Sequence, residues 1–129
     1  MSALTLDIPL AKPLPSLANS RLHWRALADL KKKQRHRTAL YFRTAGAKWL
    51  RKWLRAGDSV RISCTLTRIS GRTLDAHDNL RSAFKSVVDQ IADELALTSD
   101  RSPRIDWHYA QERGAPGYRI QLEVLEATP

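Results

Sequence analysis

Residues 78 to 95 repeat apolar side chains every three to four positions, a pattern that fits few structures. At about 100° per residue, this spacing places the apolar side chains on one face of an α-helix that packs on a core. They are Leu80, Ala83, Phe84, Val87, Val88, Ile91 and Leu95. The opposite side carries Asp78, Ser82, Lys85 and Asp89. We therefore predict a helix over residues 78 to 95 that buries one face and presents carboxylates and an amine on the other.

Four shorter stretches alternate apolar and polar residues, as half-buried strands do. They are residues 3 to 10, 59 to 69, 105 to 110 and 118 to 124. Pro9 indicates an edge strand or a strand end, because proline cannot donate to a sheet ladder. The turn at residues 113 to 117 predicts that the last two strands pair as a hairpin.

Residues 21 to 56 have a helical composition and complete the predicted order β-α-β-α-β-β. A helix of this length could bend near Gly46 or break around residues 31 to 37. The order predicts an α/β fold with a mixed four-stranded sheet covered by helices. With 129 residues, the chain is expected to be a single domain over residues 1 to 129.

The net positive charge of the chain is confined to one segment. Residues 21 to 55 hold twelve Lys and Arg against one acid, Asp29, so the net charge of this segment is +11. The rest of the chain carries a net charge of −2, which gives the total of +9. Such a field is typical of proteins that bind a phosphate backbone, although a run of charge also occurs on solvated helix faces. The residues expected to contact DNA are Arg21, Lys31, Lys32, Lys33, Arg35 and Arg37.

Three acids could meet near the start of the helix at residue 78. The turn at residues 70 to 73 places Asp75 on a loop, and a helix N-terminus keeps Asp78 ionised. Asp100 follows the helix in a loop that could return to the same end of the sheet. Carboxylate oxygens of this kind suit Mg²⁺, with Mn²⁺ as a substitute. The structural alternative is that Asp78 is an N-cap on an ordinary amphipathic helix.

Several classes of protein are disfavoured by what the sequence lacks. The single cysteine, Cys64, allows no intrachain disulfide and no multi-cysteine zinc site, and its place in an alternating run predicts a buried thiol. No P-loop or glycine-rich dinucleotide motif indicates a nucleotide cofactor. Without a leader sequence or a long apolar run, the protein is expected to be cytoplasmic and not bound to a membrane.

The acidic helix start, together with two further segments, resembles the RusA-type Holliday junction resolvases. Residues 13 to 21 look like the Pro-x-Ser-x-Asn-x-Arg segment of that family, and residues 91 to 95 and 104 to 107 resemble its later segments. The resemblance covers nearly the whole chain. It implies a homodimeric, magnesium-dependent endonuclease that nicks four-way DNA junctions symmetrically. The residues that it implies for catalysis are Asp75, Asp78 and Asp100 as metal ligands and Lys85 as the charge-neutralising lysine.

The spacing of the acids differs from the pattern of that family. The family commonly has Asp-x-Asp-Asn, whereas Ala76 stands two residues before Asp78 and Asp75 stands three before it. The family lysine often lies four residues after the second Asp, where this chain has Ser82. Lys85 shares that helix face. The alternative hypothesis is a basic, dimeric DNA-binding protein whose carboxylates are structural.

Overall fold

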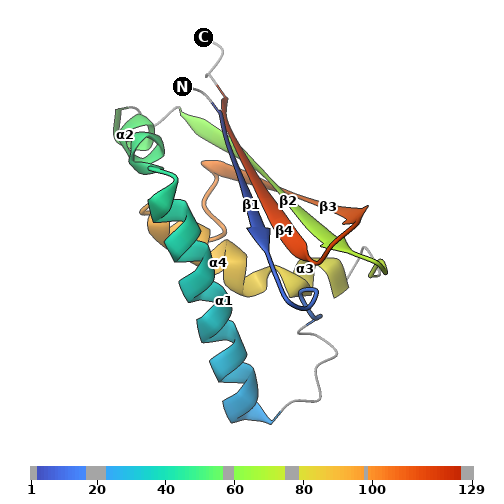
Figure 1. Ribbon diagram of the computed structural model, residues 1–129. Coiled ribbons are helices and arrows are strands. Elements are labelled where there is room, and N and C mark those ends of the chain that lie inside the picture. Colours follow the sequence, from blue (N-terminus) through green and yellow to red (C-terminus); the bar gives the residue numbers. More distant parts are fainter. Residues whose placement is uncertain (1–2, 17–22, 57–59, 75–78, 98, 126–129) are drawn as a thin grey trace.

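The protein is an α/β domain in which two helical segments and four strands alternate. The computed structural model describes residues 3–16, 23–56, 60–74, 79–97 and 99–125. Figure 1 shows the elements in chain order: β1 (Ala3–Pro9), α1 (Trp24–Thr44), α2 (Lys48–Ala56), β2 (Arg61–Ser70), α3 (Asn79–Ala83), α4 (Lys85–Glu94), β3 (Ile105–Arg113) and β4 (Gly117–Leu125). The predicted fold class and order of elements are confirmed.

The four strands form one mixed sheet in the order β1-β4-β2-β3. β2 pairs with β3 in parallel and with β4 antiparallel, and β4 also pairs antiparallel with β1. The predicted hairpin of the last two strands is therefore wrong, because β2 lies between them. The short link from β3 to β4 crosses the end of β2, where the Gly114 N–H donates to the Ser70 carbonyl over 3.3 Å.

Burial explains why β2 takes the inner position. Ile62, Cys64 and Leu66 are each 0% exposed, as is typical of a strand that has a neighbour on both sides and helices above. β1 lies at one edge, as Pro9 predicted, and β3 lies at the other. The buried thiol predicted for Cys64 is confirmed.

The helices cover one face of the sheet only. Figure 1 shows α1, α3 and α4 on the same side of the sheet. Tyr118, Ile120, Leu122 and Val124, at alternate positions of β4, are all buried, so their side chains lie on this helix-covered side. The alternate residues of the strands face solvent and include charged groups, such as the Asp7–Arg119 pair at 2.8 Å. The sheet therefore has one apolar and one polar face.

The predicted helix over residues 78 to 95 is two helices with a break at Phe84. Its apolar stripe is confirmed, since all seven of its members are buried. Phe84 is fully buried between the rings of Tyr109 and Tyr118, at centroid distances of 6.1 and 6.2 Å. Its N–H donates to the carbonyl of Arg81 three residues back, so one tight turn separates α3 from α4.

The long basic segment bends where glycine allows it. α1 continues without a break through residues 31 to 37 and ends at Thr44. Gly46 then adopts a φ of +71°, a conformation that glycine adopts readily, and α2 starts two residues later. The bend lets Leu50 and Leu54 of α2 join the core, while Trp53 stays 39% exposed. Within the residues that the structure describes, no helix is both long and apolar enough to cross a membrane.

Candidate active site

Lys85 and Asp100, fifteen residues apart, meet at the start of α4. The ammonium group of Lys85 lies 2.9 Å from Asp100 Oδ2 and 3.1 Å from Asp89 Oδ1. The loop after α4 thus doubles back, as predicted, and brings Asp100 to the first turn of the helix. Asp75 and Asp78, and with them His77, lie outside the described residues. Leu74 and Asn79, which flank that segment, are described.

The contact between Lys85 and Asp100 stabilises the charged form of both groups. The hydrogen bond to Asp100 raises the pKa of Lys85, with a further contribution from Asp89. The same hydrogen bond holds the pKa of Asp100 below its usual value. Asp100 is consequently a carboxylate at neutral pH, which is the form that accepts a hydrogen bond or binds a cation.

The edge strand β3 anchors the segments of the candidate site through alternate side chains on its helix-facing side. Trp107 Nε1 donates to the carbonyl of Asp100 over 2.8 Å and so holds the returning loop. Gln111 makes two hydrogen bonds to the backbone of Leu74, at 2.6 and 2.7 Å. Between them, the ring of Tyr109 lies under the guanidinium of Arg81, 5.5 Å from its centroid. The row 107, 109, 111 therefore connects Asp100, α3 and the chain leading to Asp75.

The proline-rich segment that follows β1 packs against the start of α3. Ser16 Oγ donates to Asn79 Oδ1 over 2.6 Å. Nearby, the buried guanidinium of Arg68 donates to the carbonyls of Leu14 and Arg72, each over 2.8 Å. Burial lowers the pKa of Arg68, and the two carbonyls supply hydrogen bonds in place of water. These contacts tie Leu14 and Ser16, which belong to the segment that resembles the N-terminal family motif, to the end of β2 and to α3.

A hollow of about 470 Å³ opens beside the Lys85–Asp100 pair. Its lining comes from α1, α3, α4, the returning loop and β3, and consists of Lys31, Arg81, Ser82, Lys85, Val88, Asp100 and Tyr109. Three cationic side chains face one carboxylate, so the hollow carries an excess of positive charge. Burial raises the pKa of Tyr109, which therefore stays a neutral hydroxyl. Such a lining suits a phosphate group.

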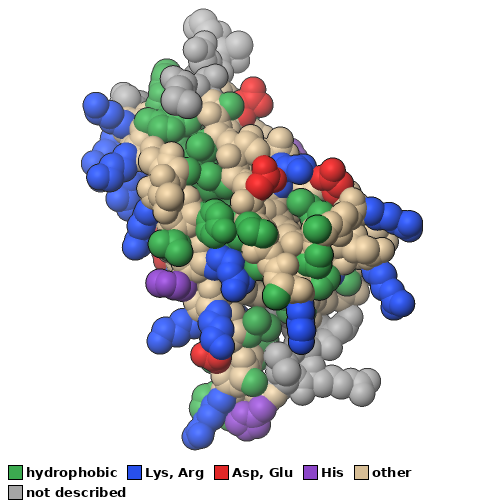
Figure 2. Space-filling model, in the orientation of Figure 1, with side chains coloured by type: hydrophobic (Ala, Val, Ile, Leu, Met, Phe, Trp, Pro, Cys, Tyr) green, Lys and Arg blue, Asp and Glu red, His purple; other side chains and the backbone are tan. Residues whose placement is uncertain are grey.

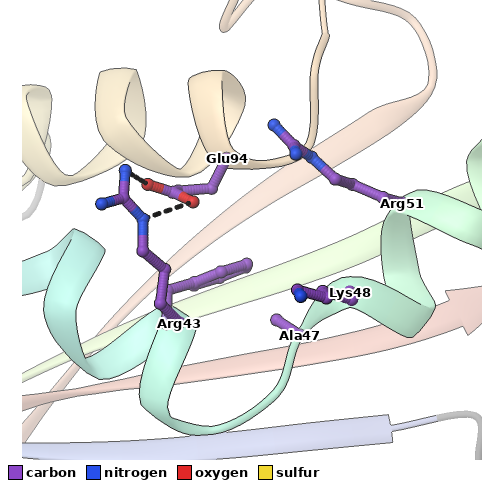
Figure 3. A pocket seen from close by; sticks show the side chains of 6 residues that line it. Arg43, Ala47, Lys48, Arg51 and Glu94 are labelled. Atoms are coloured by element: carbon purple, nitrogen blue, oxygen red, sulfur yellow. Dashed lines mark hydrogen bonds and ion pairs between the residues drawn. The ribbon is translucent and has the colours of Figure 1, made fainter.

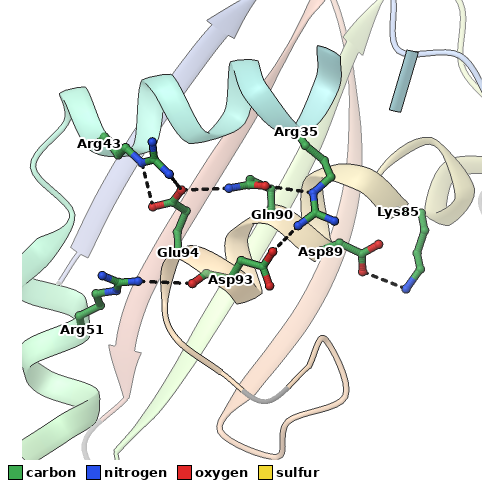
Figure 4. A network of polar contacts seen from close by, with 8 residues as sticks. All are labelled: Arg35, Arg43, Arg51, Lys85, Asp89, Gln90, Asp93 and Glu94. Carbon is green, nitrogen blue, oxygen red and sulfur yellow. Dashed lines mark hydrogen bonds and ion pairs between the residues drawn. The ribbon is translucent and has the colours of Figure 1, made fainter. Parts of the chain in front are cut away.

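The residues predicted to contact DNA have different surroundings. Lys31 lines the hollow, whereas Lys33 pairs with Asp29 at 3.0 Å. Arg35 bonds to Gln90 and Asp93 of α4 (Figure 4), so much of its charge is neutralised by a partner within the chain. Lys32 and Arg37 are exposed, and Arg21 lies outside the described residues. Figure 2 shows Lys and Arg side chains gathered over α1 and α2 with few acids among them.

The described part of the chain contains one of the three expected metal ligands. No three His, Cys, Asp or Glu side chains are grouped there so as to hold a metal ion. Asp100 has the oxygen chemistry that Mg²⁺ prefers, and Leu74 and Asn79 are held to β3 and to Ser16 on either side of the other two acids. Within the described residues, the expected metal site is therefore represented by Asp100 alone.

Sequence reasoning missed Arg81, Trp107, Tyr109 and Gln111. Gln111 could have been identified from the sequence, because it stands at a position where the alternating pattern of β3 predicts an apolar residue. Arg81 and Tyr109 had no such signal, since their pairing depends on how α3 crosses β3.

Comparison with known proteins adds no relative. No protein-family model matches the chain, and no curated protein is significantly similar to it in sequence.

Proposed function

We propose that the protein is a magnesium-dependent endonuclease that cleaves branched double-stranded DNA, with four-way junctions as its substrate and a homodimer as its working form. The observation that carries the proposal is the Lys85–Asp100 pair at the mouth of a cation-lined hollow. Two other segments contact α3 and β3, which both contribute to the lining of the hollow. One leads into the acids before Asn79, and the other is the proline-rich loop. The resemblance to the RusA family supplies the substrate class.

The hollow would bind one phosphodiester of the substrate. Lys31 and Arg81 would donate to the non-bridging oxygens, and the ring of Tyr109 would keep the guanidinium of Arg81 in place. Lys85 is 55% exposed, so its ammonium group can donate to the phosphate while it still contacts Asp100. The lysine charge would then offset the negative charge that develops on the phosphoryl group.

Hydrolysis forms a bond between a water oxygen and phosphorus and breaks the bond from phosphorus to the leaving oxygen. Asp75, Asp78 and Asp100 would hold Mg²⁺, which when bound polarises the phosphate and acidifies the attacking water. Trp107 would position Asp100 by holding its carbonyl. The leaving oxygen takes up a proton, and the products are a phosphate monoester and a hydroxyl.

Cleavage of a labelled four-way junction, compared with linear duplex of the same sequence, tests the proposal. We expect paired nicks on the junction in Mg²⁺, none in EDTA, and a loss of at least about a hundredfold in rate for Asp78→Asn and Asp100→Asn. Asp106→Asn is the matched control, because Asp106 bonds to Arg61 away from the hollow. It should cleave at the wild-type rate.

Two outcomes would overturn the proposal. If Asp106→Asn and Asp100→Asn both cleaved the junction at one-hundredth of the wild-type rate, the loss of activity would not be specific to the site. Junction binding without cleavage in either Mg²⁺ or Mn²⁺ would favour the non-catalytic DNA-binding protein, whose best support is the changed spacing between Asp75 and Asp78. Thermal unfolding of each variant shows whether it is folded.

A further inference from the structure

A second hollow lies at the elbow between α1 and α2, away from Lys85. It has a volume of about 180 Å³. Figure 3 shows its lining, which consists of Phe42, Arg43, Ala47, Lys48, Arg51 and Glu94. Phe42 and Ala47 form an apolar floor, and charged side chains form the rim. The bend at Gly46 creates the hollow, because it turns the start of α2 back toward the end of α4.

The charges on this rim do not balance. Glu94 accepts from Arg43 Nη2 over 2.9 Å and from Nε over 3.4 Å, so these two charges neutralise each other. Within the described parts of the chain, neither Lys48 nor Arg51 forms an ion pair with a carboxylate. Two positive charges therefore remain on the rim.

One polar hydrogen of Arg51 has no acceptor among the described residues. Its Nη2 reaches the carbonyl of Asp93 at 3.5 Å, at the limit of a hydrogen bond. Its Nε is buried and has no partner among the residues that the structure describes. A buried donor without an acceptor is unfavourable and is rare in folded proteins, so an anion that accepted this hydrogen bond would stabilise the hollow.

We propose that this elbow hollow, defined by Arg43, Lys48 and Arg51, is a second phosphate-binding site that holds the backbone of the bound DNA outside the cleavage site. Lys48 begins α2, so the N–H groups of the first turn add positive potential at the same point. The DNA as ligand rests on the proposed function.

The position of the elbow hollow gives it a defined place on the DNA. Lys85 begins α4 and Glu94 ends it, so the ten-residue helix separates the two hollows. That length is about 15 Å, or roughly four to five base-pair steps at 3.4 Å per step along one strand. The elbow hollow would therefore hold the arm of the substrate, not its branch point.

Fluorescence anisotropy with a labelled duplex in EDTA tests the elbow hollow apart from cleavage. The test variant is Lys48→Gln with Arg51→Gln. The control, Lys52→Gln with Arg55→Gln, removes the same charge from α2 at positions that do not line the hollow. We expect Kd to rise roughly tenfold for the test variant, and the slope of log K against log salt to fall by about 0.9. Equal losses in both variants would overturn the proposal, because they would reflect overall charge alone.

NMR of the wild-type protein gives a second measurement that needs no variant. The Nε–H signal of Arg51 should shift when duplex DNA is added, and the Arg55 signal should stay in place. A shift of the Arg51 signal with millimolar inorganic phosphate but none with duplex would overturn the assignment to DNA. Shifts with both would support it, with the phosphate group as the recognised element.

The two proposals fail in different ways. If Lys48→Gln with Arg51→Gln cleaves the junction and binds duplex DNA with an unchanged Kd, the phosphate site in the elbow hollow is refuted and the nuclease proposal stands. A shift of Arg51 with DNA in a protein that cleaves nothing would support the elbow hollow and refute the nuclease.

Discussion

Gln111 holds the backbone of Leu74 with both ends of its side-chain amide. The Leu74 N–H donates to Oε1 over 2.6 Å, and Nε2 donates to the Leu74 carbonyl over 2.7 Å. The side chain of Gln111, at the edge of the sheet, thus bonds the N–H and the carbonyl of Leu74 as the backbone of a neighbouring strand would. Leu74 is the last described residue before Asp75, so this contact fixes where the chain leads into the acids.

Gln111→Ala removes both of these hydrogen bonds. We expect the free energy of unfolding to fall by about 1–3 kcal/mol, because the N–H and carbonyl of Leu74 lose their partners. Hydrogen exchange at the Leu74 amide should speed up at least about tenfold. Gln121→Ala, at an exposed position on β4, is the control and should change neither quantity. An unchanged exchange rate at Leu74 would show that the contact is not formed in solution.

If the proposed nuclease activity is present, the same variant separates positioning from binding. Cleavage of a bound junction should slow, while the Kd for the junction stays within about twofold, since Gln111 touches no DNA in this arrangement. A rise in Kd with an unchanged cleavage rate would contradict a positioning role.

Removal of Lys85 should change how Asp100 titrates. Since the hydrogen bond from Lys85 is the largest cause of the lowered pKa, Lys85→Met should move that pKa up toward the ordinary value of about 3.9. The wild-type carboxylate stabilises the fold above its unfolded pKa, and this contribution is lost as the pH falls through the lower folded pKa. As the pH falls through this range, Lys85→Met should therefore lose less stability than the wild type.

Carbon-13 NMR of the Asp100 carboxyl group measures this directly. Lys33→Met is the control, because it removes a lysine from the exposed pair with Asp29. The control should leave the midpoint of Asp100 where it is in the wild type. Equal midpoints for wild type and Lys85→Met would refute the contact.

Gly117→Ala should destabilise the junction between β1 and β4. An added Cβ would lie 2.6 Å from the carbonyl oxygen of Ile8, a backbone atom that can move only with its strand. We expect a loss of about 1–3 kcal/mol in urea unfolding. Gly71→Ala meets nothing within 4 Å and should be nearly neutral. A neutral Gly117→Ala would show that β1 pairs more loosely than described.

Cys64 should be inert in the folded protein. Its side chain is fully buried in β2, and burial raises the pKa of the thiol, so almost no thiolate forms at neutral pH. A chromogenic disulfide reagent should therefore label Cys64 only as fast as the protein opens, and labelling should accelerate with urea. Rapid labelling without denaturant would contradict the central position of β2.

Local patterns predicted the elements, but not the pairing of the strands. Alternation located all four strands, and helical periodicity located the buried face of α3 and α4. The prediction of a hairpin was wrong because a turn motif in the sequence indicates only that the chain reverses direction. It carries no information about β2, which pairs with both β3 and β4 and so separates them. The break at Phe84 was missed for a similar reason, since it depends on the rings of Tyr109 and Tyr118.

The candidate site was predictable only in part. The return of the loop that carries Asp100 was expected from its position after the helix, but the contact of Asp100 with Lys85 was not. The pairing of Arg35 with Asp93 was not expected either, because it required α4 to present Asp93 toward α1. Charge counting treats all basic residues alike, whereas packing decides which of them keep a free charge.

The position of β4 makes the assembly of this fold a late event. Among the described strands, β1 pairs with β4 alone, which follows it by more than a hundred residues, and β4 is also a neighbour of β2. During synthesis, β1 would have to wait for β4 before it could join the sheet. Pairings this distant in sequence slow folding. Until they form, the apolar side chains of β1 are exposed, so the nascent chain would benefit from a chaperone.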